Sequence, residues 1–159
     1  MNSVKERIVR EIKRRIETQT FANVAFNRVT RRDLPPEYNG EQGSILAILE
    51  EDEVFATTAA RVMDCEMNLL LNFAVPLAAN EEAATVMNNV SAELVRALSG
   101  QKQLEEGGDG TGGAMLACYL KPLGVQASAL DDGDVCAVGE VRFKVTFRTA
   151  VHDPFTLRQ

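Results

Sequence analysis

The sequence predicts an α+β fold: a mainly antiparallel twisted sheet with two α-helices packed on one face. Two segments carry apolar residues at helical spacing, each forming a single stripe that can cover a sheet. Two other long segments alternate strictly between apolar and polar residues, which indicates long strands. Tight turns favour antiparallel pairing, and 159 residues suit a single domain, residues 1–159.

The first helix is predicted to begin after Ser3, because Ser3 and Glu6 form a capping-box pattern. Its apolar stripe consists of Val4, Ile8, Val9, Ile12 and Ile16. The face expected to meet water carries Lys5, Arg7, Arg10, Lys13, Arg14 and Arg15. A helix lying on a membrane surface is the alternative, but the stripe has no aromatic residue and suits a sheet better.

The next part of the chain is predicted to alternate between strands and loops. Residues 21–29 favour a strand, and the prolines and glycines of residues 31–43 indicate a long loop. Residues 44–60 are interpreted as a hairpin whose two arms meet around residues 51–53. Residues 63–75 alternate strictly and predict a long strand.

A second helix is predicted after Asn80, which is a favoured N-cap residue, with Glu81 and Glu82 in the first turn. Its buried stripe comprises Ala83, Val86, Met87, Val90, Leu94, Val95 and Leu98. Gly100 is expected to end it. Residues 99–114 resemble a phosphate-binding loop only superficially, since no Gly-Lys-Ser/Thr follows and acids would repel phosphate, so a flexible loop is predicted.

The C-terminal part is predicted to complete the sheet. Residues 114–130 favour a strand and residues 131–134 an acidic turn. Residues 141–151 form a long alternating strand, whose polar side carries Arg142, Lys144 and Arg148. That polar face is either solvated or in contact with a partner.

The chain shows no catalytic constellation, and we expect no enzyme activity, cofactor or metal site. His152 is the single histidine, and the three cysteines lack metal-ligand or disulfide spacing. Cys65 lies on the apolar side of its predicted strand and is interpreted as a packed core thiol. No apolar run is long enough to cross a bilayer, and the charged N-terminal helix does not resemble a secretion signal.

Charge is distributed unevenly along the chain. The net charge of −6 divides into +6 for residues 1–32, −15 for residues 33–140 and +3 for residues 141–159. The basic ends could bind nucleic acid, but the acidic middle opposes it. Surfaces of opposite sign can instead attract copies of the same protein to one another.

The order of these elements resembles the tail terminator proteins of long-tailed, siphovirus-type bacteriophages. The resemblance covers nearly the whole chain. It is carried by the N-terminal helix "VKERIVREIKRRIE", the loop "DLPPEYNG", the strand and helix "MNLLLNFAVPLAANEEAATVMNNVSAELVRAL", the glycine-rich acidic loop and the final strand "VRFKVTFRTAVHDPF".

This resemblance implies a structural virion assembly protein and not an enzyme. Such a protein forms a hexameric ring that caps the finished tail tube, ends tube polymerisation and offers an attachment surface to the head-side connector. The implied partners are further copies of the chain, the tail tube protein and the head-tail connector, with DNA only as passing cargo through a central channel. The implied location is the tail–neck junction of a virion assembled in the host bacterial cytoplasm.

The residues assigned to subunit or partner contacts are Arg14, Arg15, Arg31, Arg32, Arg142, Lys144, Arg148, Asp153 and Phe155. We expect the first four to pair with acids of a neighbouring copy, and we expect residues 31–43 and 100–114 to become ordered on contact with a partner. Phe155 either meets a partner or folds onto the core. Another head-completion or connector protein, a tail tube subunit, and a small ligand-binding domain or enzyme are the remaining alternatives.

Overall fold

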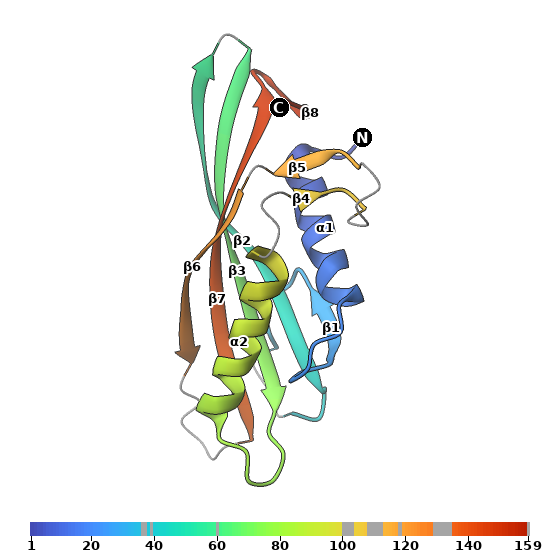
Figure 1. Ribbon diagram of the computed structural model, residues 1–159, viewed down its shortest axis with the longest axis vertical. Coiled ribbons are helices and arrows are strands. Elements are labelled where there is room, and N and C mark those ends of the chain that lie inside the picture. The colour runs from blue at the N-terminus through green and yellow to red at the C-terminus, as the bar shows by residue number, and fades with distance from the viewer. Residues whose placement is uncertain are drawn as a thin grey trace.

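A computed structural model describes residues 1–35, 38, 40–59, 61–99, 104–107, 113–117, 119–128 and 135–158. The elements in chain order are α1 (Val4–Thr18), β1 (Phe26–Thr30), β2 (Ser44–Ala59), β3 (Val62–Pro76), α2 (Ala83–Ser99), β4 (Leu104–Glu105), β5 (Met115–Ala117), β6 (Tyr119–Ser128), β7 (Cys136–Ala150) and β8 (Asp153–Leu157). Figure 1 shows a strongly twisted sheet with both helices in front of it.

The main sheet has six strands in the order β1-β2-β3-β7-β6, with β8 paired to β7 beyond the end of β6. The α+β prediction is confirmed. Pairing is antiparallel as predicted for every strand pair except β1 and β2, which run parallel. A parallel pair needs a connection of about a dozen residues or more, and residues 31–43 are long enough to let the chain return to the same end.

The predicted hairpin within residues 44–60 is wrong, because β2 is one continuous strand of 16 residues. It pairs along its length with β3, and the reversal comes at its end, where Arg61 has a φ of 82°. Between Glu50 and Glu53 the register shifts, so that the strand gains one residue over its partner. Such a bulge interrupts the alternation of side chains, and in the sequence this interruption looks like a turn.

A single hydrophobic core lies between the sheet and the two helices. Its strand residues include Leu46 and Ile48 of β2, Cys65, Met67, Leu69, Leu71 and Phe73 of β3, and Val141, Phe143, Val145 and Phe147 of β7. All of these positions point to the same side of the sheet. We call the opposite side the open face.

Helix α1 agrees closely with the prediction. The N–H of Glu6 donates to the Ser3 hydroxyl at 3.2 Å, and the whole predicted stripe is buried. One expectation is wrong: Arg15 does not face water but is buried against Glu11, which is itself 4% exposed. A buried carboxylate needs cationic partners, and the sequence pattern alone does not distinguish such an arginine from its exposed neighbours.

Helix α2 begins at Ala83, later than predicted. Asn80 has a φ of 72° and lies in the preceding turn. The N–H of Val86 donates to the carbonyl of Glu82 at 3.1 Å. Asn80 is therefore not the N-cap, and the first turn contains no acid. The predicted stripe is buried at Val90, Leu94 and Leu98. Gly100 lies outside the described residues.

Part of the predicted flexible loop of residues 99–114 is ordered structure. Residues 104–105 form β4, which pairs with β5, and both Leu104 and Leu116 are fully buried. Residues 100–103 and 108–112 lie outside the described residues. The small β4–β5 sheet packs against α1, where Leu104 adds to the core.

The last long strand ends at Ala150, and the chain then reverses. His152 has a φ of 63°, and β8 runs back along β7 from Asp153. The upper ends of β2, β3 and β7 project past the N-terminus of α1, with β8 beside them (Figure 1). The final strand therefore finishes in a small hairpin, and the exposed side chains of that hairpin lie at one extremity of the molecule.

Candidate assembly surfaces

The basic residues predicted for partner contacts are largely paired within the chain. Arg31, directly after β1, donates from Nη1 to Glu6 Oε2 at 2.7 Å and from Nη2 to Glu50. The hydrogen bond from Arg31 lowers the pKa of Glu6 below its usual range. These contacts join α1, β1 and β2, so Arg31 stabilises its own subunit.

Arg32 differs from Arg31 although it is the next residue. It is exposed, and within the described part of the chain its guanidinium makes no salt bridge. Its backbone N–H donates to the Thr30 hydroxyl at 3.1 Å, which holds the turn after β1. Arg32 therefore lies exposed on the surface, and its assignment to a partner contact stays a prediction.

Arg14 and Arg15 converge on Glu11. Arg14 Nη2 lies 2.7 Å and Arg15 Nε 3.0 Å from Glu11 Oε1, and the N–H of Gly107 donates to Glu11 Oε2 at 3.2 Å. Burial opposes the charged form of Glu11, but these hydrogen bonds outweigh it and lower the pKa of the carboxyl. Together with the ion pair between Arg7 and Glu106, they attach the turn after β4 to α1.

The open face carries the three basic residues of β7. Arg142 pairs with Glu140 at 2.6 Å, Lys144 with Glu66 at 2.6 Å and Arg148 with Asp64 at 2.8 Å. The last two pairs cross from β7 to β3. Exposed ion pairs of this kind contribute little to stability, so Arg142, Lys144 and Arg148 can exchange these partners for others in an interface.

The C-terminal hairpin presents one apolar side chain to solvent. Phe155 is 45% exposed and does not belong to the core. Asp153 accepts hydrogen bonds from the backbone N–H of Phe155 at 3.0 Å and from the Thr156 hydroxyl. Asp153 thus organises its own turn, whereas Phe155 is left free for a contact.

The sequence analysis did not identify the apolar side chains on strands β2 and β6 that are about half exposed or more: Val54, Phe55, Tyr119, Leu123 and Val125. The first two lie on the projecting half of β2, and the other three lie on β6 at the edge of the sheet. Their exposure depends on edge position, because each lies on a stretch of strand with a neighbour on one side only, and no local sequence pattern marks such a stretch.

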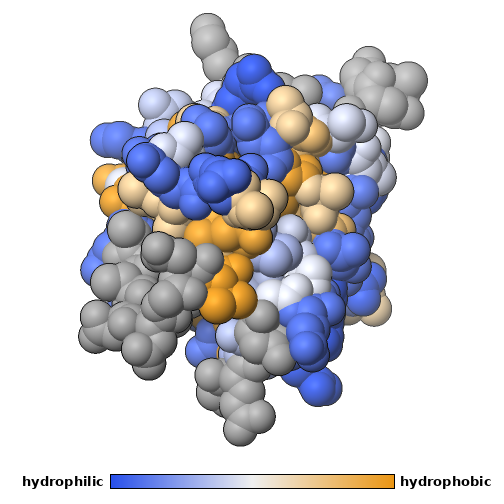
Figure 2. All heavy atoms as spheres, turned by 90° about the horizontal axis from the view of Figure 1, so that it is seen from below, coloured by the Kyte–Doolittle hydropathy of each residue, from blue (hydrophilic) through white to orange (hydrophobic). Residues whose placement is uncertain are grey.

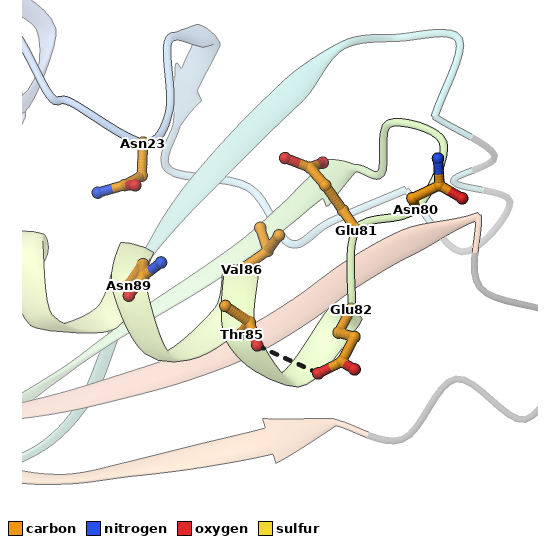
Figure 3. A pocket seen from close by; sticks show the side chains of 7 residues that line it. All are labelled: Asn23, Asn80, Glu81, Glu82, Thr85, Val86 and Asn89. Carbon is orange, nitrogen blue, oxygen red and sulfur yellow. Dashed lines mark hydrogen bonds between the residues drawn. The ribbon is translucent and has the colours of Figure 1, made fainter.

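A hollow beside the start of α2 offers no catalytic arrangement among its lining residues. It has a volume of about 360 Å³ and is lined by Asn23, Asn80, Glu81, Glu82, Thr85, Val86 and Asn89. Figure 3 shows that most of these side chains come from the start of α2 and the turn before it, with a hydrogen bond between Thr85 and Glu82. The lining contains amides and carboxylates but no histidine or thiol.

The described cysteines are packed thiols. Cys65 and Cys136 are buried, and burial raises the pKa of both. The complete burial of Cys65 in the core confirms the prediction that it is a core residue. A raised pKa also leaves little nucleophilic thiolate. Among the described residues, no group of three or more His, Cys, Asp or Glu could hold a metal ion.

The described helices include none that is long and apolar enough to cross a bilayer. Seen from below, the molecule shows a mixed surface, with polar residues around an apolar patch near the middle (Figure 2).

A solved structure with a similar fold is the sheath/tube terminator of an extracellular contractile injection system, PVC, in its extended state. The match has a TM-score of 0.53 and 14% sequence identity, and it covers 96% of this chain and 60% of the terminator chain. No protein-family model and no curated protein sequence matches the chain. The similarity at this level of identity is one of fold, and the chain spans only about 60% of the terminator's length.

Proposed function

We propose that this chain is the terminator of a tail-like tube. Copies of it form a ring on the last layer of the finished tube, block further subunit addition and present a surface to the next component. The observation that carries the proposal is the fold, which matches a sheath/tube terminator over 96% of this chain. The order of elements in the sequence points to the same class of protein independently.

The two lines of support differ in the type of particle. The sequence resembles terminators of siphovirus-type phages, and the structural neighbour belongs to a contractile injection system. Both are tail-end assembly proteins. We therefore propose the shared role, with a six-membered ring, a tube subunit and a head-side connector as partners, at the tail–neck junction of a particle.

The charges and exposed side chains suit such a ring. A closed ring repeats one heterologous contact, so each subunit must present two different surfaces that complement each other. Arg32 and Phe155 are exposed at separate places, and neither is committed to its own subunit's core or salt bridges within the described residues. We propose that these two residues, together with the open-face Arg142, Lys144 and Arg148, contribute to subunit or tube contacts.

The test begins with the solution mass of the purified chain, measured by light scattering at low and high salt, followed by negative-stain electron microscopy. We expect a closed ring of about six chains that weakens as salt increases, because exposed charges are screened. Long open tubes would instead identify a tube subunit. A salt-independent monomer with no ring on tube ends would refute the terminator assignment.

A second measurement addresses the terminating role itself. Particles assembled without this chain should carry tubes of uncontrolled length, because nothing stops subunit addition. Restoring the chain should restore a uniform length. Unchanged tube lengths in its absence would show that the ring serves another neck position.

A further inference from the structure

The charge of the main sheet changes sign once across its width, between β3 and β7. Strand β2 carries four acids and no basic residue, and β3 carries two acids and no basic residue. Strand β7 carries three basic residues and one acid, and β6 carries one lysine and no acid. Since β2, β3, β7 and β6 are neighbours in this order, the sheet is acidic toward β2 and basic toward β6.

The outer edge of β2 has no partner strand over its projecting half. Strand β1 pairs only with residues 44–47 of β2, and the strand continues to Ala59. Glu50 is held by Arg31, but Glu51 and Asp52 are exposed and make no salt bridge with any residue that the structure describes. The edge from Glu51 onward therefore has no neighbour among the described strands and carries two exposed carboxylates, of which Glu51 also attracts Arg142 electrostatically.

The outer edge of β6 has the complementary character. Strand β6 pairs with β7 on one side only, and Tyr119, Leu123 and Val125 are each about half exposed, at 55%, 50% and 48%. Pro122 has no N–H to donate, which suits an edge strand. A long apolar edge of this kind is a site for adding another strand unless it is covered.

Lys121 on this edge lies beside another lysine. In the ladder between β6 and β7 it lies opposite Lys144, which already pairs with Glu66 on its other side. Like charges directly opposite each other are unfavourable. No described residue forms a salt bridge with Lys121. An acid supplied from outside the subunit would relieve this arrangement.

We propose that the free edge of β2 in one copy pairs with the free edge of β6 in the next copy, so that the sheets of neighbouring subunits join. Strands β2 and β6 run in opposite directions within one subunit, so an antiparallel alignment keeps the open faces of both copies on the same side. With Asp52 beside Lys121, this alignment places Val54 beside Tyr119, two residues later in β2 and two residues earlier in β6. Charge then meets opposite charge, and exposed apolar side chains cover each other. The two edges differ, so the contact is heterologous and repeats in the manner a ring requires.

The occupant of each edge is a second copy of this chain because the complementary edge is present on the same molecule. Both edges expose apolar residues that one contact would bury together. Because this inference rests on the proposed ring, the experiment must separate failure of the ring from failure of the edge contact.

The experiment reverses charges singly and together. Asp52→Lys and Lys121→Glu each place like charges across the contact, and the double variant restores opposite charges with the polarity exchanged. We expect each single reversal to raise the concentration needed for half-assembly by about tenfold or more at low salt, and the double variant to return toward the wild type. Glu81→Lys changes the charge equally at an exposed turn away from both edges and should assemble normally.

The outcomes separate the two ideas. A wild-type chain that forms no ring refutes the proposed function together with the edge contact. A wild-type ring that both single reversals leave intact, or that the double variant fails to restore, refutes the edge contact alone. Hydrogen exchange on the wild type gives a second measurement that needs no variant: the amides of residues 51–57 and 119–126 should become protected on ring formation, and unchanged exchange at both edges would overturn the proposal.

Discussion

Gly139 of β7 is a position where a single methyl group should destabilise the fold. It lies opposite Phe73 of β3 and is buried beneath α2. A Cβ atom at this position would lie 2.4 Å from Cζ of Phe73, 2.9 Å from its Cε1 and 2.8 Å from Cγ of Met87. The Phe73 ring is fully buried, so it has little room to move aside.

The expected cost of Gly139→Ala follows from these contacts. Overpacking a well-filled core costs about 1–3 kcal/mol, and the lower chain entropy of alanine in the unfolded state returns about 0.4–1 kcal/mol. A net loss of about 1–2 kcal/mol should lower the melting temperature by about 2–8 °C for a chain of this size. Thermal unfolding followed by circular dichroism measures this shift.

Gly124 of the neighbouring strand β6 provides the matched control. A Cβ atom there would meet nothing within 4 Å, and its backbone conformation is open to other residues. Gly124→Ala should therefore leave the melting temperature unchanged or slightly raised. Phe73→Leu should partly relieve Gly139→Ala, so that the double variant loses less than the sum of the two single losses. Equal melting temperatures for the two alanine variants would refute the packing argument.

Two further predictions concern titratable groups. The hydrogen bond from Arg7 lowers the pKa of Glu106 from its usual 4.5, so the attachment of β4 to α1 is fully present above pH 4.5 and is lost as the pH falls through the lowered value. The protection factor of the Leu104 amide, which is its intrinsic exchange rate at each pH divided by the observed rate, should fall over that range, and Arg7→Gln should remove this pH dependence. Burial raises the pKa of the Cys65 and Cys136 thiols, so a maleimide reagent at neutral pH should label these two residues only at the rate of unfolding. Rapid labelling of Cys65 or Cys136 in the folded chain, located by peptide mass spectrometry, would contradict their burial.

The candidate surfaces were only partly visible in the sequence. Charge alone predicts the same role for Arg31 and Arg32. In the structure Arg31, which follows β1, pairs with Glu6 of α1 and Glu50 of β2, whereas Arg32 is exposed. The sequence does not predict the exposure of the apolar residues of β2 and β6, because alternation tells which side of a strand is apolar but not whether another strand lies beside it. Edge position is a property of the sheet order, which depends on contacts between distant segments.

The sequence by itself determined the local features of this protein. The Ser3 cap and apolar stripe of α1 and the long alternation of β3 arise from residues a few positions apart, and their physical causes, capping and one-sided burial, act at that range. The class of fold follows from these elements.

Only the tertiary structure decided how the segments meet. The parallel pairing of β1 with β2 and the continuous pairing of β2 with β3 across a bulge depend on hydrogen bonds between backbone groups far apart in the chain. The same holds for the burial of Arg15 with Glu11, whose pairing is stabilised by the turn that follows β4. Hydrogen bonds and charge pairs between distant segments form only once the core has brought these segments together. A local sequence pattern therefore does not show which distant residue becomes the partner.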